Sequence, residues 1–261
     1  SFEHIPEADL RTSFGPVIDR LAKNGIDLTK RGIEVSPIAH YHMGGVRVDV
    51  RMATAVPGLY AAGEAVGGAN GANRLSGNAL SEAFVFGERA GRFAAEDVAD
   101  LESGWSEEAA AAALDEIVAS RNVSATESGP GLSGMLVELQ ELMWQDVGLV
   151  RTQGQLDSAL ARVREMRAEI GERPGESDHR FALSMQDWFD MRNSLMIAET
   201  IIIGAQIRTE SRGAHQREDF PLTDPSLEHN LVTRLDGDGF AVEPVALVAK
   251  SYDLVPLEAA E

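Results

Sequence analysis

Apolar residues recur at helical spacing over much of this chain. Between residues 7 and 24 they share one face and predict an amphipathic helix, which the Gly15-Pro16 pair is expected to kink or split. A second helix is predicted over 79–98, where apolar and small residues lie on one side and would allow close packing against a neighbour. Short apolar stretches and a glycine-rich loop at 67–77 separate the two helices.

Three stretches carry the pattern of β structure. Residues 46–50 alternate between apolar and polar positions, and residues 59–62 form a short apolar strand that leads into Gly63-Glu64. Further along, the run Asp-Gly-Asp-Gly at 236–239 separates two apolar stretches, 231–235 and 240–242. Turn residues between two such stretches predict a hairpin.

Residues 106–213 are predicted to be almost entirely helical. Ser106 is a candidate N-cap, because two glutamates follow it in the first turn, where the helix dipole favours negative charge. Short loops between long amphipathic helices predict an antiparallel bundle, with Trp144 and Trp188 in its core. The predicted helices cover 109–120, 135–151, 156–170 and 181–209.

Composition narrows the classes of partner. The formal net charge is −19, from 42 acidic and 23 basic residues, and this argues against nucleic acid, which needs a basic face. The chain has no cysteine, so it forms no disulfide and ligates no iron–sulfur cluster itself. No apolar run approaches the ~20 residues that a membrane-spanning helix requires.

The chemistry-bearing residues are concentrated between 40 and 80. Glu64 follows a short apolar strand, a suitable place for a carboxylate that grips a ribose, and the loop after it runs into a helix N-terminus, which favours negative charge. Arg74 lies in that loop and could hold a carboxylate with its planar fork. His40 and His42 could bind a metal together, but no third ligand lies nearby in the sequence. Either residue could instead be a structural histidine.

Four ordered blocks resemble one known family. They are His-Tyr-His-Met-Gly-Gly at 40–45, Pro-Gly-Leu-Tyr-Ala-Ala-Gly-Glu at 57–64, Gly-Ala-Asn-Arg-Leu-Ser-Gly-Asn-Ala-Leu at 71–80 and Ser-Arg-Gly-Ala-His-Gln-Arg-Glu-Asp at 211–219. Together they resemble the FAD-dependent flavoprotein subunit of succinate dehydrogenase and fumarate reductase, and the related L-aspartate oxidase. The resemblance implies FAD as cofactor and a dicarboxylate substrate such as succinate or fumarate.

The resemblance also implies roles for particular residues. His40 resembles the substrate-binding histidine, Arg74 resembles the arginine that holds a substrate carboxylate, and Glu64 resembles the residue that binds the FAD ribose. Ala79 and Leu80 match the pair whose backbone amides face the flavin pyrimidine edge. The helix that opens near Asn78 would place partial positive charge beside the flavin. The sequence departs from the family's pattern at Ala79, where Ser is usual, and at Asn70, where respiratory members usually carry His.

The expected fold class is α/β plus all-α. The C-terminal segment of an FAD-binding domain would be followed by an antiparallel helical bundle and an irregular tail with a β-hairpin. The expected parts are the end of a capping (substrate) domain, the C-terminal part of the FAD-binding domain, the bundle and the tail, at residues 1–36, 37–104, 105–213 and 214–261.

The resemblance implies partners as well. Nothing here matches the family's glycine-rich ADP-binding fingerprint, so the chain is expected to need an N-terminal FAD-binding half, in the same polypeptide or on another chain, and to be inactive alone. An iron–sulfur subunit is a further candidate partner. The expected location is the cytoplasm, where a partner could hold the protein at the inner face of a membrane.

Other interpretations stay open at this level. An L-aspartate oxidase would use the same flavin site with an amino dicarboxylate, and the block at 211–219 fits both enzymes. An isolated helical bundle could instead be a non-catalytic interaction module. Arg212, His215 and Arg217 could help to surround the active site or a subunit contact, or could tie the bundle to the flavin domain.

Overall fold

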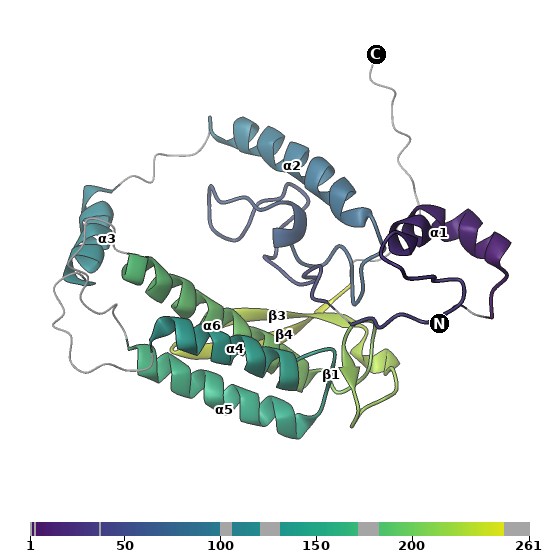
Figure 1. Cartoon of the computed structure of the whole chain (residues 1–261). Helices are drawn as coiled ribbons and strands as arrows, with labels where there is room; N and C mark the ends of the chain where they lie inside the picture. The colour runs from purple at the N-terminus through teal and green to yellow at the C-terminus, as the bar shows by residue number, and fades with distance from the viewer. Residues whose placement is uncertain are drawn as a thin grey trace, which may run out of the picture. The chain divides into compact units, whose positions relative to one another are not determined.

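The computed structural model describes residues 2, 4–36, 38–99, 106–120, 131–171 and 183–247 (Figure 1). The chain divides into two compact units, Ser1–Tyr41 and His42–Glu261, and each is described by itself. The division of the chain into four domains stays a prediction.

The first unit is built around α1, Glu7–Ala22. Its backbone leaves helical geometry at Phe14 (φ −130°, ψ 18°), two residues before Pro16, so the predicted kink is present. Proline has no N–H to donate and its ring crowds the preceding turn, which accounts for the kink. Leu10 and Ile18 are buried together with Leu28 from the segment that follows the helix.

The second unit begins with irregular chain where two strands were predicted. Only isolated bridges form there: Val46 pairs with Val66 in parallel, and Ala53 pairs with Tyr60 in antiparallel fashion. The predicted strands 46–50 and 59–62 are therefore wrong in extent. A strand persists only where a neighbour satisfies its backbone groups in a ladder, and each stretch meets such a neighbour at one position. A short 3-10 helix, η1 (Gly63–Ala65), follows.

The helix α2, Asn78–Asp97, begins one residue before its predicted start and also ends one residue early. Gly63 of η1 lies close to it, because a Cβ built on Gly63 would be 3.6 Å from the Ala83 Cα. The apolar side that was predicted to pack closely against a neighbour is otherwise open within the described residues: Leu80 is 68% exposed and Phe84 is 74% exposed.

Four more helices follow in the described part of the second unit: α3 (Glu107–Ser120), α4 (Leu132–Asp146), α5 (Gln153–Ile170) and α6 (Leu183–Ile207). The Ser106 hydroxyl accepts a hydrogen bond from the Ala109 amide at 3.2 Å, as expected of an N-cap. Residues 181 and 182, which the last predicted helix included, lie outside the described residues.

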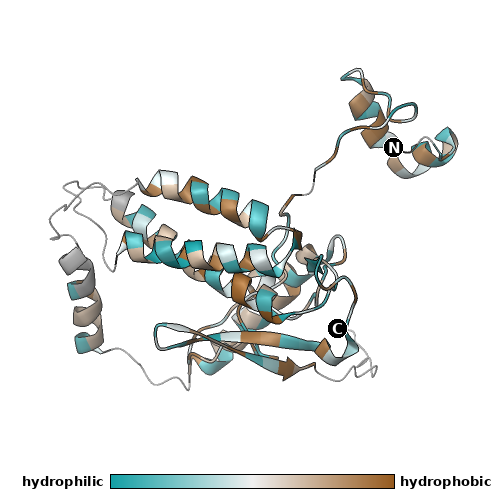
Figure 2. Ribbon diagram, turned by 90° about the horizontal axis from the view of Figure 1, so that it is seen from below, coloured by the Kyte–Doolittle hydropathy of each residue, from teal (hydrophilic) through white to brown (hydrophobic). Residues whose placement is uncertain are grey.

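Helices α4, α5 and α6 share one hydrophobic core. In Figure 2 hydrophobic and hydrophilic positions are mixed along the helices. The most deeply buried side chains come from α5 and α6, namely Leu156, Ala159, Val163, Met166, Leu195 and Ile202. Trp188 is buried as predicted, whereas the prediction for Trp144 is wrong because more than half of it is exposed.

The helix predicted over 135–151 ends early, at Asp146. The chain then turns at Gly148, where a Cβ would lie 2.5 Å from the Trp144 carbonyl oxygen. Beyond this turn, β1 (Val150–Arg151) pairs in parallel with β2 (Gln216–Arg217), a pairing between distant segments that local periodicity does not encode.

Near the end of the described chain, a 3-10 helix η2 (Pro225–Leu227) leads into β3 (His229–Asp236), which pairs in antiparallel fashion with β4 (Gly239–Ala246). The run of acidic and glycine residues at 236–239 makes the turn between them. Across the whole described chain, no helix is long and apolar enough to cross a membrane.

Two isoleucines of α6 test the position of the core. Ile202 is 0% exposed and Ile197 is 55% exposed. We expect Ile202→Ala to lower the free energy of unfolding by about 2–5 kcal/mol, because it removes buried methyl groups and leaves a cavity. Ile197→Ala should change it by no more than about 0.5 kcal/mol. Urea denaturation followed by circular dichroism measures both; equal losses would contradict this packing.

Candidate functional site

The segment 42–46 joins two of the predicted site residues. The His42 amide donates to Glu64 Oε1 at 2.8 Å, and the Arg74 amide donates to the Met43 sulfur at 3.2 Å. Glu64 and Arg74 are ten residues apart in sequence, yet each is bonded to one of two consecutive residues. The structure therefore fixes the Glu64 carboxylate and the Arg74 backbone amide on consecutive residues of one segment.

Close backbone contact fixes the far end of this segment. The Val46 amide donates to the Ala65 carbonyl at 2.7 Å, and the Gly67 amide donates to the Val46 carbonyl at 3.1 Å. A Cβ on Gly45 would lie 2.4 Å from the Ala65 oxygen, so only glycine fits. The segment 42–46 thus holds both the side chain of Glu64 and the residue that follows it, Ala65.

The start of α2 forms the third part of the site. Gly77 has a left-handed backbone (φ 87°) and redirects the chain into the helix, whose first three residues are Asn78, Ala79 and Leu80. Its N-cap residue is this glycine, so no N-cap side chain bonds the first amides among the described residues. Its first amides carry partial positive charge, so the donor set suits a group that presents acceptor or anionic atoms.

The remaining predicted residue, His40, belongs to the first unit, where its side chain is exposed. Since that unit is described by itself, the role of His40 remains a prediction. His42 contributes its backbone amide to Glu64.

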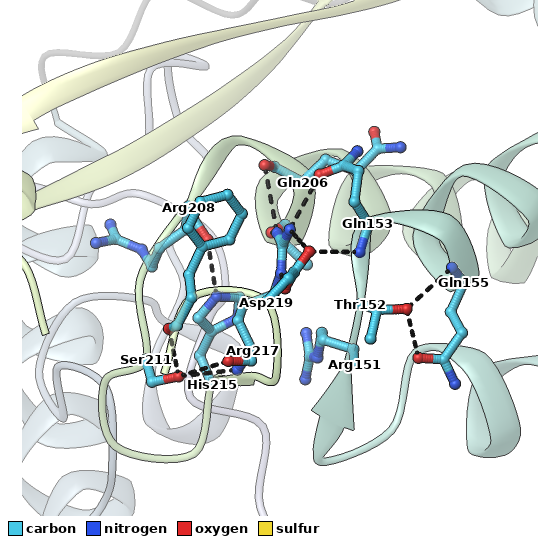
Figure 3. A network of polar contacts seen from close by, with 12 residues as sticks. Arg151, Thr152, Gln153, Gln155, Gln206, Arg208, Ser211, His215, Arg217 and Asp219 are labelled. Atoms are coloured by element: carbon cyan, nitrogen blue, oxygen red, sulfur yellow. Dashed lines mark hydrogen bonds and ion pairs between the residues drawn. The ribbon is translucent and has the colours of Figure 1, made fainter. Parts of the chain in front are cut away.

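The segment 208–221 is organised around Arg217, whose side chain is 0% exposed (Figure 3). Its guanidinium donates two hydrogen bonds to Asp219, both at 2.8 Å, and others to the Ala205 carbonyl at 2.8 Å and the Gln153 side chain at 3.0 Å. The hydrogen bonds from Arg217 lower the pKa of Asp219. Arg217 therefore ties the end of α6 to the start of α5, a structural role.

Glu210 is buried between two arginines. Arg208 Nη1 and Arg212 Nε each donate to Glu210 Oε1 at 2.8 Å, and the Asp224 amide donates to Oε2 at 2.8 Å. Burial alone would raise the pKa of Glu210, but the hydrogen bonds from Arg212, the Asp224 amide and Arg208 lower it to about 2. Arg212 is thus engaged by a carboxylate of its own segment.

The same segment contacts the loop that carries Arg74. The Ala214 amide donates to the Ala72 carbonyl at 2.9 Å, two residues from Arg74. His215 follows, with Nε2 at 3.0 Å from the Arg208 carbonyl, and burial lowers its pKa (Figure 3). Sequence reasoning missed both Ala72 and Met43, because a carbonyl and a thioether carry no signal of their own.

A groove of about 800 Å³ lies elsewhere in the second unit, between the end of α5, α6 and the turn between β3 and β4. Its lining includes Arg164 and Glu199, and Arg164 and Arg167 both donate to the buried Glu199. None of the predicted site residues lines it.

Two family models match the chain. The FAD binding domain matches residues 1–80, and the C-terminal domain of the fumarate reductase flavoprotein matches residues 137–253. These matches define the chain as part of an FAD-dependent flavoprotein.

Similar proteins narrow the class further. The chain is 34% identical over 88% of its length to a subunit of the fumarate reductase (CoM/CoB) of Methanothermobacter marburgensis, and 35% identical over 84% of its length to the L-aspartate oxidase of Pseudomonas aeruginosa. Sdh1 of Mycobacterium smegmatis, solved in complex with UQ1, aligns over 96% of this chain with a TM-score of 0.77 and 32% identity.

The chain belongs to the FAD-dependent flavoprotein family of succinate dehydrogenase and fumarate reductase, and the cofactor of this family is FAD. The chain covers 41% of the Methanothermobacter protein, 38% of the Pseudomonas protein and 43% of the mycobacterial one. Its residues thus correspond to less than half of each of these relatives.

A matched pair of glycines tests the contact between the two loops. Gly213 and Gly237 both have φ 58°, but a Cβ on Gly213 would lie 2.4 Å from the Ala72 oxygen, whereas Gly237 has open space. Replacing either glycine with alanine should lower the free energy of unfolding by about 1–2 kcal/mol, because a side chain strains the left-handed backbone. Only Gly213→Ala should also speed hydrogen exchange of the Ala214 amide and of the loop that carries Arg74. Unchanged exchange there would contradict the contact.

The buried Glu210 predicts a particular dependence of stability on pH. Since its pKa is about 2 in the folded state against an ordinary value of 4.5, its contribution is fully present above pH 4.5 and is lost as pH falls toward 2. Glu210→Gln should lower the free energy of unfolding at pH 7 by about 3 kcal/mol, and the difference from wild type should shrink by more than half at pH 3. Denaturant titrations at both pH values measure this, with the exposed Glu218→Gln as control. A difference that is independent of pH would refute the ion-pair account.

Proposed function

We propose that this chain forms part of a flavoprotein oxidoreductase that interconverts succinate and fumarate, or a similar dicarboxylate pair. The observation that carries the proposal is the junction at His42 and Met43, to which Glu64 and Arg74 are bonded. A flavoenzyme for a dianion needs a carboxylate for the ribose of its cofactor and a cation for the substrate, and Glu64 and Arg74 would supply them.

Arg74 is assigned to a substrate carboxylate. Its amide is fixed on Met43, and its Nη1 donates to the Leu75 carbonyl at 3.3 Å, a long bond that a carboxylate can replace. A guanidinium presents a planar fork that matches a carboxylate with two parallel hydrogen bonds. In a protein of net charge −19 such a local cation is also what makes a dianion bind at this place.

Glu64 and the start of α2 are assigned to FAD. Glu64 is exposed and receives the His42 amide at Oε1, and this bond would hold its carboxylate in place for a ribose hydroxyl. Asn78, Ala79 and Leu80 open a helix without a side-chain cap, and their amides would face the flavin pyrimidine edge. When bound, FAD supplies the hydride acceptor or donor for the C2–C3 bond of the dicarboxylate. Positive potential from the helix start would favour the reduced cofactor.

The rest of the enzyme is also part of the proposal. His40 would bind and polarise the second substrate carboxylate, and an N-terminal FAD-binding half would complete the cofactor site. An iron–sulfur subunit would exchange electrons with the flavin and could hold the protein at the inner, cytoplasmic face of a membrane. The solved relative in complex with UQ1, which the chain matches at 32% identity, supports the electron-transfer setting.

The assignment of Arg74 predicts a loss of substrate affinity. In the complete flavoprotein, Arg74→Ala should weaken succinate binding about 30-fold or more, because truncating one partner of a charge-assisted pair costs about 2 kcal/mol or more. Perturbation of the flavin absorption spectrum during a succinate titration measures the dissociation constant. Arg47→Ala removes a nearby exposed cation and serves as the control for net charge. An Arg74→Ala enzyme that binds succinate like the wild type would rule the assignment out.

L-aspartate oxidation is the second candidate, favoured by the 35% identity to the Pseudomonas L-aspartate oxidase. Both reactions use a dicarboxylate of the same length, so Arg74 and Glu64 would serve either one. Anaerobic bleaching of the flavin separates them. Bleaching by succinate and not by L-aspartate supports the proposal, and the reverse result supports the oxidase.

A further inference from the structure

A side-chain network closes the loop that carries Arg74. The Asn78 carboxamide nitrogen donates to Asn70 Oδ1 at 3.0 Å and to Glu82 Oε1 at 2.8 Å. Because a carboxylate only accepts, the nitrogen of Asn78 must face Glu82, and its second N–H is then directed to Asn70. The bond between Asn70 and Asn78 joins the two ends of the loop 70–78, with Arg74 at its midpoint.

The most buried member of this network, Glu82, orders the other two side chains. Glu82 is 5% exposed although it lies on the helix that leaves the loop, and it stands one turn after Asn78. Asn70 and Asn78 are both half-buried. A hydrogen bond to a buried carboxylate is short and strong, so Glu82 fixes the rotamer of Asn78, and the fixed carboxamide holds Asn70.

Within the loop, the Asn78 amide also donates to the Leu75 carbonyl at 3.2 Å. Gly71 and Gly77 have positive φ values and open space around them, so the backbone near both ends of the loop is intrinsically permissive. The loop is anchored from outside at the Ala72 carbonyl and at the Arg74 amide. The contact between Asn70 and Asn78 adds the closure that joins the end of the loop to the helix start.

We propose that Asn70 and Glu82 are positioning residues for substrate binding: through Asn78 they set the shape of the loop 70–78 and so the place of the Arg74 guanidinium relative to the first turn of α2. This inference rests on the proposed function. Neither residue needs to touch the dicarboxylate, because each acts through the Asn78 side chain.

The test compares variants that remove an acceptor with variants that keep it. Asn70→Ala loses the acceptor oxygen, whereas Asn70→Asp keeps one; likewise Glu82→Ala loses it and Glu82→Gln keeps one. In the complete flavoprotein we expect both alanine variants to weaken succinate binding about fivefold or more, and the acceptor-keeping variants to restore most of the affinity. Flavin difference spectra measure the dissociation constant, and the melting temperature of each variant is recorded beside it. Asn193→Ala, an exposed position on α6, is the matched control.

Arg74→Ala measured in parallel separates two kinds of failure. If Arg74→Ala loses affinity while Asn70→Ala and Glu82→Ala bind like the wild type, the positioning role is overturned and the proposed function stands. If Arg74→Ala itself binds normally, the proposed function fails. Alanine variants that lose only melting temperature, or Asn70→Asp and Glu82→Gln variants as weak as their alanine counterparts, also overturn the positioning role.

Discussion

The candidate site depends on the hydrogen bonds that fasten the segment 42–46 to its neighbours. The His42 amide holds the carboxylate of Glu64, the Met43 sulfur holds the amide of Arg74, and Val46 exchanges backbone bonds with the last residue of η1 and with Gly67. These contacts hold the segment 42–46 against η1 and against the loop that carries Arg74, because isolated bridges replace a full sheet there.

A second set of contacts connects this site to the helices. The Ala214 amide meets the Ala72 carbonyl, and the segment that contains Ala214 is itself locked by Arg217 and Glu210. Arg217 joins α5 and α6. Buried and paired charged groups therefore connect the helices of the hydrophobic core to the loop that carries Arg74. Such a pair is costly to break from one side, which makes the segment 208–221 a rigid support.

The sequence predicted the helices and the family better than the two short strands at 46–50 and 59–62. Helical periodicity located α1, α2 and α5 within a few residues, and contiguous motifs identified the family. The stretch 46–50 alternates like a strand but pairs with a neighbour at one position only. Trp144 was predicted to lie in the core because it is apolar, but more than half of it is exposed. Contacts made by backbone atoms, such as Ala72 with Ala214, depend on tertiary geometry and cannot be predicted from the residue types. The role of His40 rests on resemblance alone.

The most direct test of the common site is a crystal structure of the complete flavoprotein with FAD and a bound dicarboxylate. Glu64 should hydrogen-bond the ribose, the amides of Ala79 and Leu80 should face the flavin ring, and Arg74 should hold a carboxylate of the ligand. A structure in which Arg74 points away from the ligand, or in which the start of α2 is packed against protein instead of the flavin, would contradict the account.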